Sequence, residues 1–271
     1  MLRFLHILLI LFAGICLPAQ ESIALSGDFK NVIVPTEKKI FYKIAQTTFT
    51  VKIQEYGDNT DYVFINLHDD EETSVEAAKM ILQEHGGMLI EIENKLQRNL
   101  RFQLGNYFYR VDPNRIFSAE GIKKSMEQLG RSSARAVTEV EKFGNYLISI
   151  LPVNRKCIIA LHNNTPGFFS ANDYAAGNSR TTESKKVYLN PTQDTDDFYL
   201  TTDSKLYEQL ADKGFNTILQ DNKNCTEDGS LSVYFGKQEI RYVNCETEHG
   251  KTEQYLEMLK ALFDVLKKES R

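Results

Sequence analysis

Short apolar runs and amphipathic segments alternate along the chain. The apolar run Tyr62–Leu67 predicts a buried strand. The segment Val75–Glu84 follows with helical spacing, behind a capping-box signature made by Thr73 and Glu76. A second β-like run, Met88–Ile92, comes directly after this helix. A strand, a helix and a strand in this order favour a parallel or mixed sheet whose faces are covered by helices.

The same alternation continues on both sides of this unit. Further strands are expected at Phe29–Val34, Ile40–Ile44, Thr48–Gln54, Cys157–Leu161, Lys186–Leu189, Asn216–Leu219 and Ile240–Cys245. Further helices are expected at Ala119–Leu129, Ala134–Ile150, Lys205–Lys213 and Thr252–Lys267. The polar stretch from 162 to 185 predicts a long loop. We therefore predict an α/β fold, with one domain over residues 20–271 and a mixed, mostly parallel β-sheet flanked by helices.

The first residues of the chain depart from this pattern. Arg3 precedes the apolar run Phe4–Leu17, and small residues follow up to Ala19. The run is shorter than the roughly 18 apolar residues that a membrane span needs, and its flanks are typical of a secretory signal. We expect residues 1–19 to be a cleaved signal peptide and the protein to be secreted or periplasmic, with no membrane span. A lipoprotein anchor on Cys16 is the alternative.

The composition is that of an ordinary globular protein. Of the 271 residues, 42% are hydrophobic and 25% are charged, which excludes long disorder and collagen-like or low-complexity repeats. The formal net charge is −5, from 32 basic and 37 acidic residues. A weakly acidic chain with scattered basic residues argues against electrostatic binding to nucleic acid, so no nucleic-acid partner is expected.

Three cysteines follow the signal segment. No pair of them has the CxxC spacing of a thiolate zinc site or a thioredoxin-like motif. After export, Cys225 and Cys245 could form a disulfide and leave Cys157 buried, since extracellular compartments are oxidising. A fully reduced chain is the alternative.

Two of the expected strands end in Leu-His followed by a polar loop. His68 comes after the strand Tyr62–Leu67, with Glu71 three residues later, and His162 comes after Leu161. Ligands bind α/β sheets at the carboxyl ends of strands, and two imidazoles with one carboxylate are the ligand set of a catalytic zinc. The sequence therefore predicts a metal site, with His249 as the competing ligand. An acidic surface loop before a helix is the alternative interpretation of residues 68–72.

The order of these motifs resembles a known family. His68-x-x-Glu71, followed some ninety residues later by His162, is similar to the zinc site of the carboxypeptidase A family of metallopeptidases, which includes enzymes that trim cell-wall peptides. Between these ligands, Asp112–Arg115 reads Asp-Pro-Asn-Arg and is similar to the family's Asp-x-Asn-Arg element. The segment Ile240–Gly250 resembles the strand that carries the family's catalytic glutamate.

This resemblance implies roles for individual residues. One Zn²⁺ ion would be held by the two histidines and Glu71, and Asn114 and Arg115 would hold the C-terminal carboxylate of the substrate. The arginine that polarises the scissile carbonyl would be Arg101, with Arg98 and Arg110 as alternatives.

The resemblance also implies an activity. A metal-activated water would hydrolyse a peptide bond near a free C-terminal carboxylate, with Glu246 as general base and Glu248 as the alternative base. The substrate would be a peptide or a cell-wall peptide. Two other functions stay open: a zinc amidase or deacylase acting on acylated amino acids or muropeptides, and a noncatalytic binding relative.

Overall fold

The structure is a computed structural model and describes residues 32–268. The signal peptide predicted at residues 1–19 lies outside this range, as does part of the strand predicted at Phe29–Val34. Residues 32–35 precede the first strand and belong to no helix or strand. None of the helices in the described range is long and apolar enough to cross a membrane.

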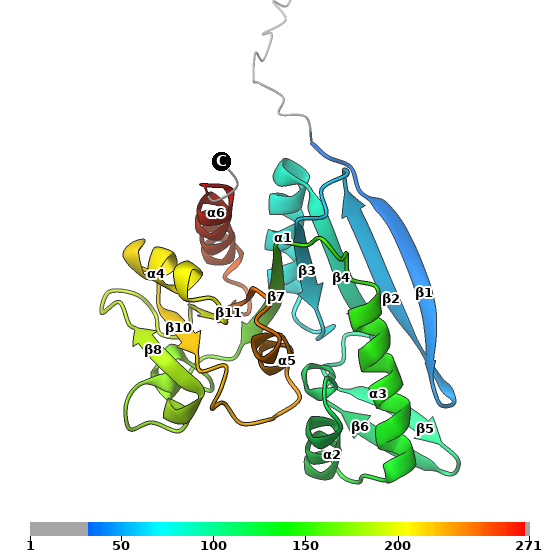
Figure 1. The fold of residues 1–271 in the computed structure, drawn as a ribbon. Coiled ribbons are helices and arrows are strands. Elements are labelled where there is room, and N and C mark those ends of the chain that lie inside the picture. Colours follow the sequence, from blue (N-terminus) through cyan, green and yellow to red (C-terminus); the bar gives the residue numbers. More distant parts are fainter. Residues whose placement is uncertain (1–31, 269–271) are drawn as a thin grey trace, which may run out of the picture. The chain divides into compact units, whose positions relative to one another are not determined.

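A nine-stranded mixed sheet runs through the described residues (Figure 1). In spatial order its strands are β1 (Thr36–Ile44), β2 (Thr47–Tyr56), β4 (Gly87–Glu93), β3 (Tyr62–Asn66), β7 (Cys157–Asn164), β11 (Tyr242–Glu248), β9 (Phe198–Thr201), β10 (Thr217–Gln220) and β8 (Ser184–Tyr188). The central neighbours β4, β3, β7 and β11 are parallel, and β9 and β10 form a further parallel pair. The other neighbouring strands pair antiparallel. The predicted mixed sheet is confirmed, with parallel strands at its centre.

Helices flank both faces of this sheet, as predicted. They are α1 (Glu72–His85), α2 (Ala119–Gln128), α3 (Ala134–Ser149), α4 (Ser204–Asp212), α5 (Leu231–Lys237) and α6 (Thr252–Lys268), with the 3₁₀ turns η1 (Pro113–Arg115), η2 (Ala171–Tyr174) and η3 (Thr181–Glu183). Helices α1, α4 and α6 contribute to one hydrophobic core, and α2, α3 and α5 contribute to the other.

Residues along each central strand alternate between the two cores, because successive side chains of a strand point to opposite faces. In β7, Ile159 and Leu161 join the core beneath α1, α4 and α6, whereas Ile158 and Ala160 join the core beneath α2, α3 and α5. By the same alternation, His162 projects from the face of Ile158 and Ala160. The sheet therefore directs this histidine toward the side that carries α2, α3 and α5.

Several local features differ from the sequence prediction. The pattern does not predict β9, α5 or the separate hairpin of β5 (Leu100–Leu104) and β6 (Tyr107–Val111). Each of these elements has only four to seven residues, too few for a clear apolar period. The capping role predicted for Thr73 is wrong, because Thr73 is the second residue of α1 and Glu71 is its N-cap residue. The Thr73 hydroxyl instead accepts a hydrogen bond from the Gly250 N–H.

The cysteines follow the reduced alternative. Cys225 and Cys245 both carry thiols, so the disulfide considered between them is not formed. Cys157 is buried, as expected, on β7. The fold therefore depends on its two cores rather than on a cross-link between these residues.

Candidate metal centre

Three side chains converge where the central parallel strands end. His68 follows β3, and His162 lies in β7, which pairs with β3 so that Asn66 stands opposite Leu161. Neighbouring parallel strands have their carboxyl ends at the same edge of a sheet, so the segment after β3 passes close to His162. Glu71 is the N-cap residue of α1, and its N–H donates to the His68 carbonyl at 3.1 Å. This turn brings the Glu71 carboxylate back to both histidines.

The donor atoms form a tight group. The Nδ1 atoms of His68 and His162 lie 3.3 Å apart, and each lies 3.0 Å from an oxygen of Glu71. None of the three side chains is more than 6% exposed. A tetrahedral zinc ion with bonds of about 2.0–2.2 Å holds its ligand atoms roughly 3.3 Å apart. The three predicted ligands are thus brought together as a group that can hold a metal ion, and its donor set fits zinc.

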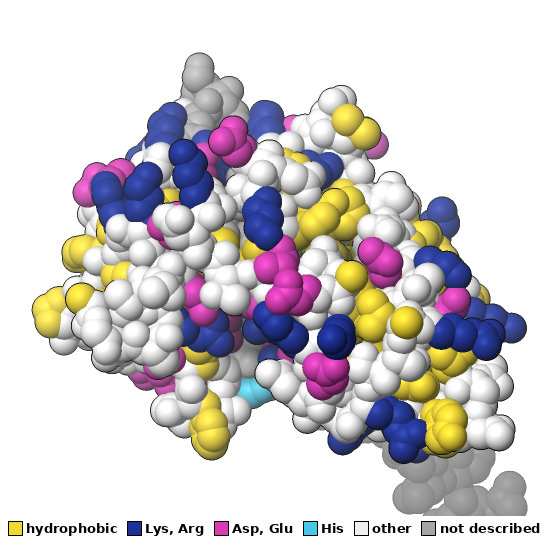
Figure 2. Space-filling model, turned by 60° about the horizontal axis from the view of Figure 1, so that its bottom comes forward, with side chains coloured by type: hydrophobic (Ala, Val, Ile, Leu, Met, Phe, Trp, Pro, Cys, Tyr) yellow, Lys and Arg dark blue, Asp and Glu magenta, His cyan; other side chains and the backbone are white. Residues whose placement is uncertain are grey.

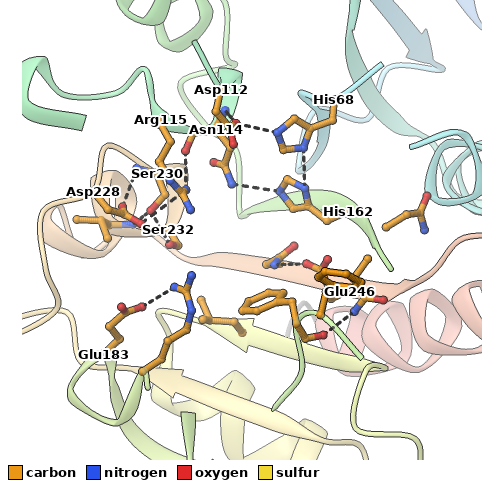
Figure 3. Close-up of a pocket in the computed structure, with 18 of the residues that line it drawn as sticks. His68, Asp112, Asn114, Arg115, His162, Glu183, Asp228, Ser230, Ser232 and Glu246 are labelled. Carbon is orange, nitrogen blue, oxygen red and sulfur yellow. Dashed lines mark hydrogen bonds and ion pairs between the residues drawn. The ribbon is translucent and has the colours of Figure 1, made fainter. Parts of the chain in front are cut away.

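A polar side chain also lies close to the Nε2 atom of each imidazole, on the side away from the ligand group (Figure 3). Asp112 Oδ1 lies 2.8 Å from His68 Nε2, and Asn114 Nδ2 lies 3.4 Å from His162 Nε2. Asp112 is itself fixed, because it caps η1 by accepting from the Asn114 N–H and its own N–H donates to Ser125. A carboxylate on the outer nitrogen of a ligating histidine fixes the ring orientation and leaves the inner nitrogen for the metal.

The charges in this group stabilise one another. Burial alone would lower the pKa of His68, but the Glu71 and Asp112 carboxylates raise it to about 9. Burial would raise the pKa of Glu71, yet the two histidines hold it well below its usual range. The pKa of Asp112 is likewise low, because His68 and nearby arginines outweigh its burial. The carboxylates of Glu71 and Asp112 are therefore ionised. A metal cation bound to the imidazoles could take over from the proton on His68 as their positive partner.

The loop before β5 brings an arginine to the same group. Arg98 Nη1 donates to Glu71 Oε1 at 2.5 Å, and Arg98 lines the pocket in front of the histidines. Asp69 anchors this loop, because its Oδ2 accepts from the N–H groups of Asn94 (2.6 Å) and Leu96 (2.7 Å). Lys95 and Leu96 both have a φ of 56°, a left-handed conformation that is strained for residues with side chains. The Asp69 carboxylate offsets this strain.

Replacing Asp69 by alanine should therefore destabilise the protein. Two N–H groups would lose their acceptor, and we expect the free energy of unfolding to fall by about 1–3 kcal/mol. Denaturant unfolding of the purified variant measures this change. Asp58→Ala is the matched control, because Asp58 is exposed in the turn between β2 and β3 and should change stability by less than about 0.5 kcal/mol. Equal stability of the two variants would contradict the anchoring role of Asp69.

A buried carboxylate stands beside the metal group. Glu246 lies in β11 directly opposite His162 in β7, and it lines the same pocket with only 5% of the residue exposed. Burial raises its pKa, although the His162 charge opposes this effect. Asn244 donates to Glu246 Oε2 at 3.0 Å and holds the carboxylate in place. Glu248, by contrast, pairs with Lys251 at 2.7 Å and does not line this pocket.

Arg115 reaches the pocket from η1. Its Nη1 donates to the Asn114 carbonyl at 2.8 Å and lies 3.6 Å from Asp228 Oδ2. The Asn114 side chain is held by the N–H of Leu231, which donates to Oδ1 at 3.2 Å. Figure 3 shows Arg115 beside Asp228 and Ser230, on the other side of Asn114 from the two histidines. The two substrate-binding residues predicted at Asn114 and Arg115 thus lie next to the metal group.

The remaining candidate residues differ in whether they line this pocket. Arg101 is exposed on β5, and its guanidinium stacks on the Phe108 ring at 4.0 Å, away from the residues that line the pocket. Arg110 donates to the carbonyl of Leu129. Arg98, an alternative for the same role, is the member of this set that lines the pocket. His249 also lines the pocket but is not part of the three-residue ligand group.

These groups open onto one pocket of about 480 Å³. In Figure 2 a histidine side chain is visible in a hollow of the surface, below basic and acidic side chains. Beyond the metal group the pocket is lined by residues that no sequence motif indicated, among them Phe169, Tyr174, Arg180, Glu183, Leu200, Asp228, Ser232 and Val233. Several of these belong to the polar stretch 162–185, for which only a long loop was predicted.

Comparisons with known proteins give distant structural matches. No protein-family model and no curated protein sequence matches the chain. One match is an aspartoacylase family protein from Mesorhizobium loti, with 16% identity and a TM-score of 0.45. The match covers 91% of this chain and 71% of that protein. Another match is the murein-tripeptide amidase MpaA from Escherichia coli O157, with 13% identity and a TM-score of 0.42. The match covers 87% of this chain and 92% of that protein.

A third match is LapA from Legionella, with 11% identity and a TM-score of 0.38 over 85% of this chain. This chain spans 60% of the length of that LapA structure. At such identities and TM-scores the three matches assign neither a family nor an activity to this chain. The chemistry of the site has to be argued from its own residues.

Proposed function

We propose that the protein is a zinc-dependent peptidase that hydrolyses a peptide bond next to a free C-terminal carboxylate. The observation that carries this proposal is the content of one pocket. His68 and His162 of the ligand group, the buried carboxylate of Glu246 and the guanidinium of Arg115 all face it. A hydrolase of this kind needs a metal, a base and an anchor for the substrate, and these residues can supply all three.

Each residue of the site would have a separate role in hydrolysis. Zinc held by His68, Glu71 and His162 would supply a Lewis acid that polarises a carbonyl and favours ionisation of water. Glu246 would accept a proton from the attacking water and deliver it to the leaving amine, and its raised pKa suits a group that must do both. Arg98 lines the pocket beside the ligand group, where a guanidinium can contact the carbonyl oxygen of the scissile bond.

Arg115 would orient the substrate. A guanidinium can grip a carboxylate with two parallel hydrogen bonds, which a lysine cannot do with the same geometry. The substrate's last peptide bond would then lie over the ligand group, and the enzyme would act from the C-terminal end of a peptide. The signal peptide expected at residues 1–19 would place this activity outside the cytoplasm, on free peptides or cell-wall peptides.

An amidase or deacylase is the second candidate function. The same ligand group and base could act on the amide bond of an acylated amino acid or a muropeptide. A required carboxylate next to the cleaved bond separates the peptidase from an amidase whose substrate lacks one, since Arg115 can form its bidentate contact only with such a group. An acylated amino acid carries the same carboxylate, so a deacylase is separated instead by preferring a single acylated amino acid to a peptide. A noncatalytic role is disfavoured by the buried carboxylate of Glu246, which lines the pocket beside the ligand group and which metal binding alone does not require.

Replacing Arg115 by alanine should lower kcat/KM by about 30- to 1000-fold on peptides with a free C-terminus, because a bidentate charge-assisted contact is lost. Amidated versions of the same peptides should be poor substrates of the unmodified protein and should lose little further. Steady-state kinetics of zinc-loaded protein on both peptide sets measures these effects.

Arg135→Ala is a suitable control for this experiment. Arg135 is exposed on α3 and does not line the pocket, so kcat/KM should stay within about twofold of the unmodified protein. Equal cleavage of free and amidated peptides by the unmodified protein would defeat the carboxypeptidase proposal and favour the amidase alternative.

A further inference from the structure

A third guanidinium lines the pocket, besides those of Arg98 and Arg115. Arg180 lies just before η3, in the stretch that the sequence predicts only as a long loop. Its Nη1 donates to Glu183 Oε2 at 3.0 Å. Its guanidinium carbon lies 5.1 Å from the centre of the Phe169 ring and 5.8 Å from that of Tyr174. A carboxylate and two aromatic rings thus hold the Arg180 side chain at the pocket wall.

Arg180 and Arg115 line the same pocket. Figure 3 shows Arg115 with Asp228 on one side of the pocket and Glu183, the partner of Arg180, on the other. Burial raises the pKa of Tyr174, and the charges of both Arg180 and Arg115 oppose that rise. The Asp228 carboxylate, 3.6 Å from Arg115, also contributes to the raised pKa of Arg180. Both guanidiniums line the same pocket of about 480 Å³, so both can reach one ligand bound there.

We propose that the pocket selects substrates whose terminal residue carries a second carboxylate. Arg115 would bind the C-terminal carboxylate and Arg180 the side-chain carboxylate, as in a peptide that ends in glutamate or aspartate. This proposal rests on the peptidase function proposed above and specifies its substrate class.

The unused hydrogen-bond donors favour an anion. A guanidinium has five N–H donors, and among the described residues the Arg180 guanidinium donates only to Glu183, through Nη1. Arg115 likewise uses only Nη1, toward the Asn114 carbonyl and Asp228. Both guanidiniums therefore keep donors that a carboxylate of the ligand can accept from in a bidentate manner.

The two carboxylates beside these guanidiniums, Glu183 and Asp228, are less available to a cationic ligand. Glu183 is paired with Arg180, and Asp228 accepts from the Ser230 N–H at 2.9 Å besides facing Arg115. A lysine-ended substrate would have to compete with guanidiniums that cannot lose their charge. The pocket is also lined by Leu200 and Val233, whose apolar side chains suit the methylene groups of a glutamate side chain.

The test compares N-blocked peptides that differ only in the last residue: glutamate, glutamine, lysine or leucine. For the unmodified zinc-loaded protein we expect kcat/KM to be at least about 10-fold higher with glutamate than with glutamine. In Arg180→Gln this ratio should fall to about 1–2, and Arg135→Ala should leave it unchanged. A ratio measured on one enzyme preparation does not depend on how much of the variant is folded.

A binding measurement gives a readout besides turnover. In the Glu246→Gln protein, calorimetry should show tighter binding of the glutamate-ended peptide than of the glutamine-ended one, and adding Arg180→Gln should remove the difference. The charge reversal Arg180→Glu should move the preference toward the lysine-ended peptide.

The outcomes separate this inference from the function on which it rests. Cleavage of all four peptides with no preference for glutamate, or a preference for lysine or leucine, would overturn the role of Arg180 and leave the peptidase proposal intact. If none of the four peptides were cleaved and the glutamate-ended peptide did not bind, both proposals would fail. A preference for glutamate that persists in Arg180→Gln would also overturn the inference, since another group would then recognise the side chain.

Discussion

Replacing His162 by alanine is expected to abolish binding of one equivalent of zinc. The variant would lose one of three ligand residues whose donor atoms all lie within 4.8 Å of one another, and two ligands rarely hold zinc in a protein. Mutation of outer residues that only orient metal ligands already costs about 10- to 100-fold in metal affinity, so losing a ligand should cost more than about 100-fold. Zinc content of the purified protein, measured by atomic absorption after dialysis, gives the result directly.

The fold should survive this change. His162 ends a strand whose preceding residues are buried in two separate cores, and these cores rather than an ion organise the sheet. We expect the far-UV circular dichroism spectrum of the variant to match that of the unmodified protein. Loss of zinc with loss of fold would instead mean that the metal group is structural.

His249→Ala provides the matched control. His249 lines the same pocket but lies outside the ligand group, so this variant should keep its full equivalent of zinc. Undiminished zinc in the His162 variant, or zinc loss in the His249 variant, would contradict the ligand assignment.

The ligand group could be predicted because it depends on the strongest pattern in the sequence. The runs before His68 and His162 are short, apolar and fully buried in the structure, so their ends could be located from sequence. Parallel pairing then brings those ends to one edge of the sheet. Glu71 follows within three residues, and the local turn decides its position.

The choice among the arginines could not be made from sequence. Arg98 and Arg101 are three residues apart, and the short hairpin that contains Arg101 and Arg110 shows no clear period. In the structure Asp69 anchors the loop that carries Arg98, whereas Arg101 lies on the exposed side of β5. The long-range hydrogen bonds of Asp69 decide this difference, and no local pattern encodes them.

Arg180 was missed for a different reason. It lies in a polar stretch without hydrophobic period, and its partners Glu183, Phe169 and Tyr174 belong to the same stretch. What gives Arg180 a place in the pocket is how this loop folds: η2 contacts η3 and packs against β8 and β10. Arg115, in contrast, lies in an Asp-Pro-Asn-Arg element whose resemblance to the Asp-x-Asn-Arg motif of a known family implies carboxylate recognition. The polar composition of residues 162–185 therefore predicts a long loop, but only the structure shows that one of its side chains, Arg180, lines the pocket.

The Glu246→Gln variant should keep zinc and bind substrate, yet turn over at least about 100-fold more slowly. Glutamine has nearly the same shape as glutamate but cannot accept a proton from water at neutral pH. The substitution leaves the ligand group intact, because Glu246 faces His162 across neighbouring strands and is not one of the ligands. Single-turnover kinetics at saturating peptide, together with zinc content and peptide binding, separates this loss of chemistry from a loss of binding.

Glu248→Gln tests whether the right carboxylate has been identified, because both residues project from the same face of β11. Glu248 is paired with Lys251 at 2.7 Å and does not line the pocket, so its replacement should slow turnover by no more than about threefold. A large loss in Glu248→Gln with none in Glu246→Gln would make Glu248 the base, two residues further along the strand. If neither variant slowed turnover, the two buried neighbours Glu246 and His162 would not form a hydrolytic centre, and the proposed mechanism would have to be abandoned.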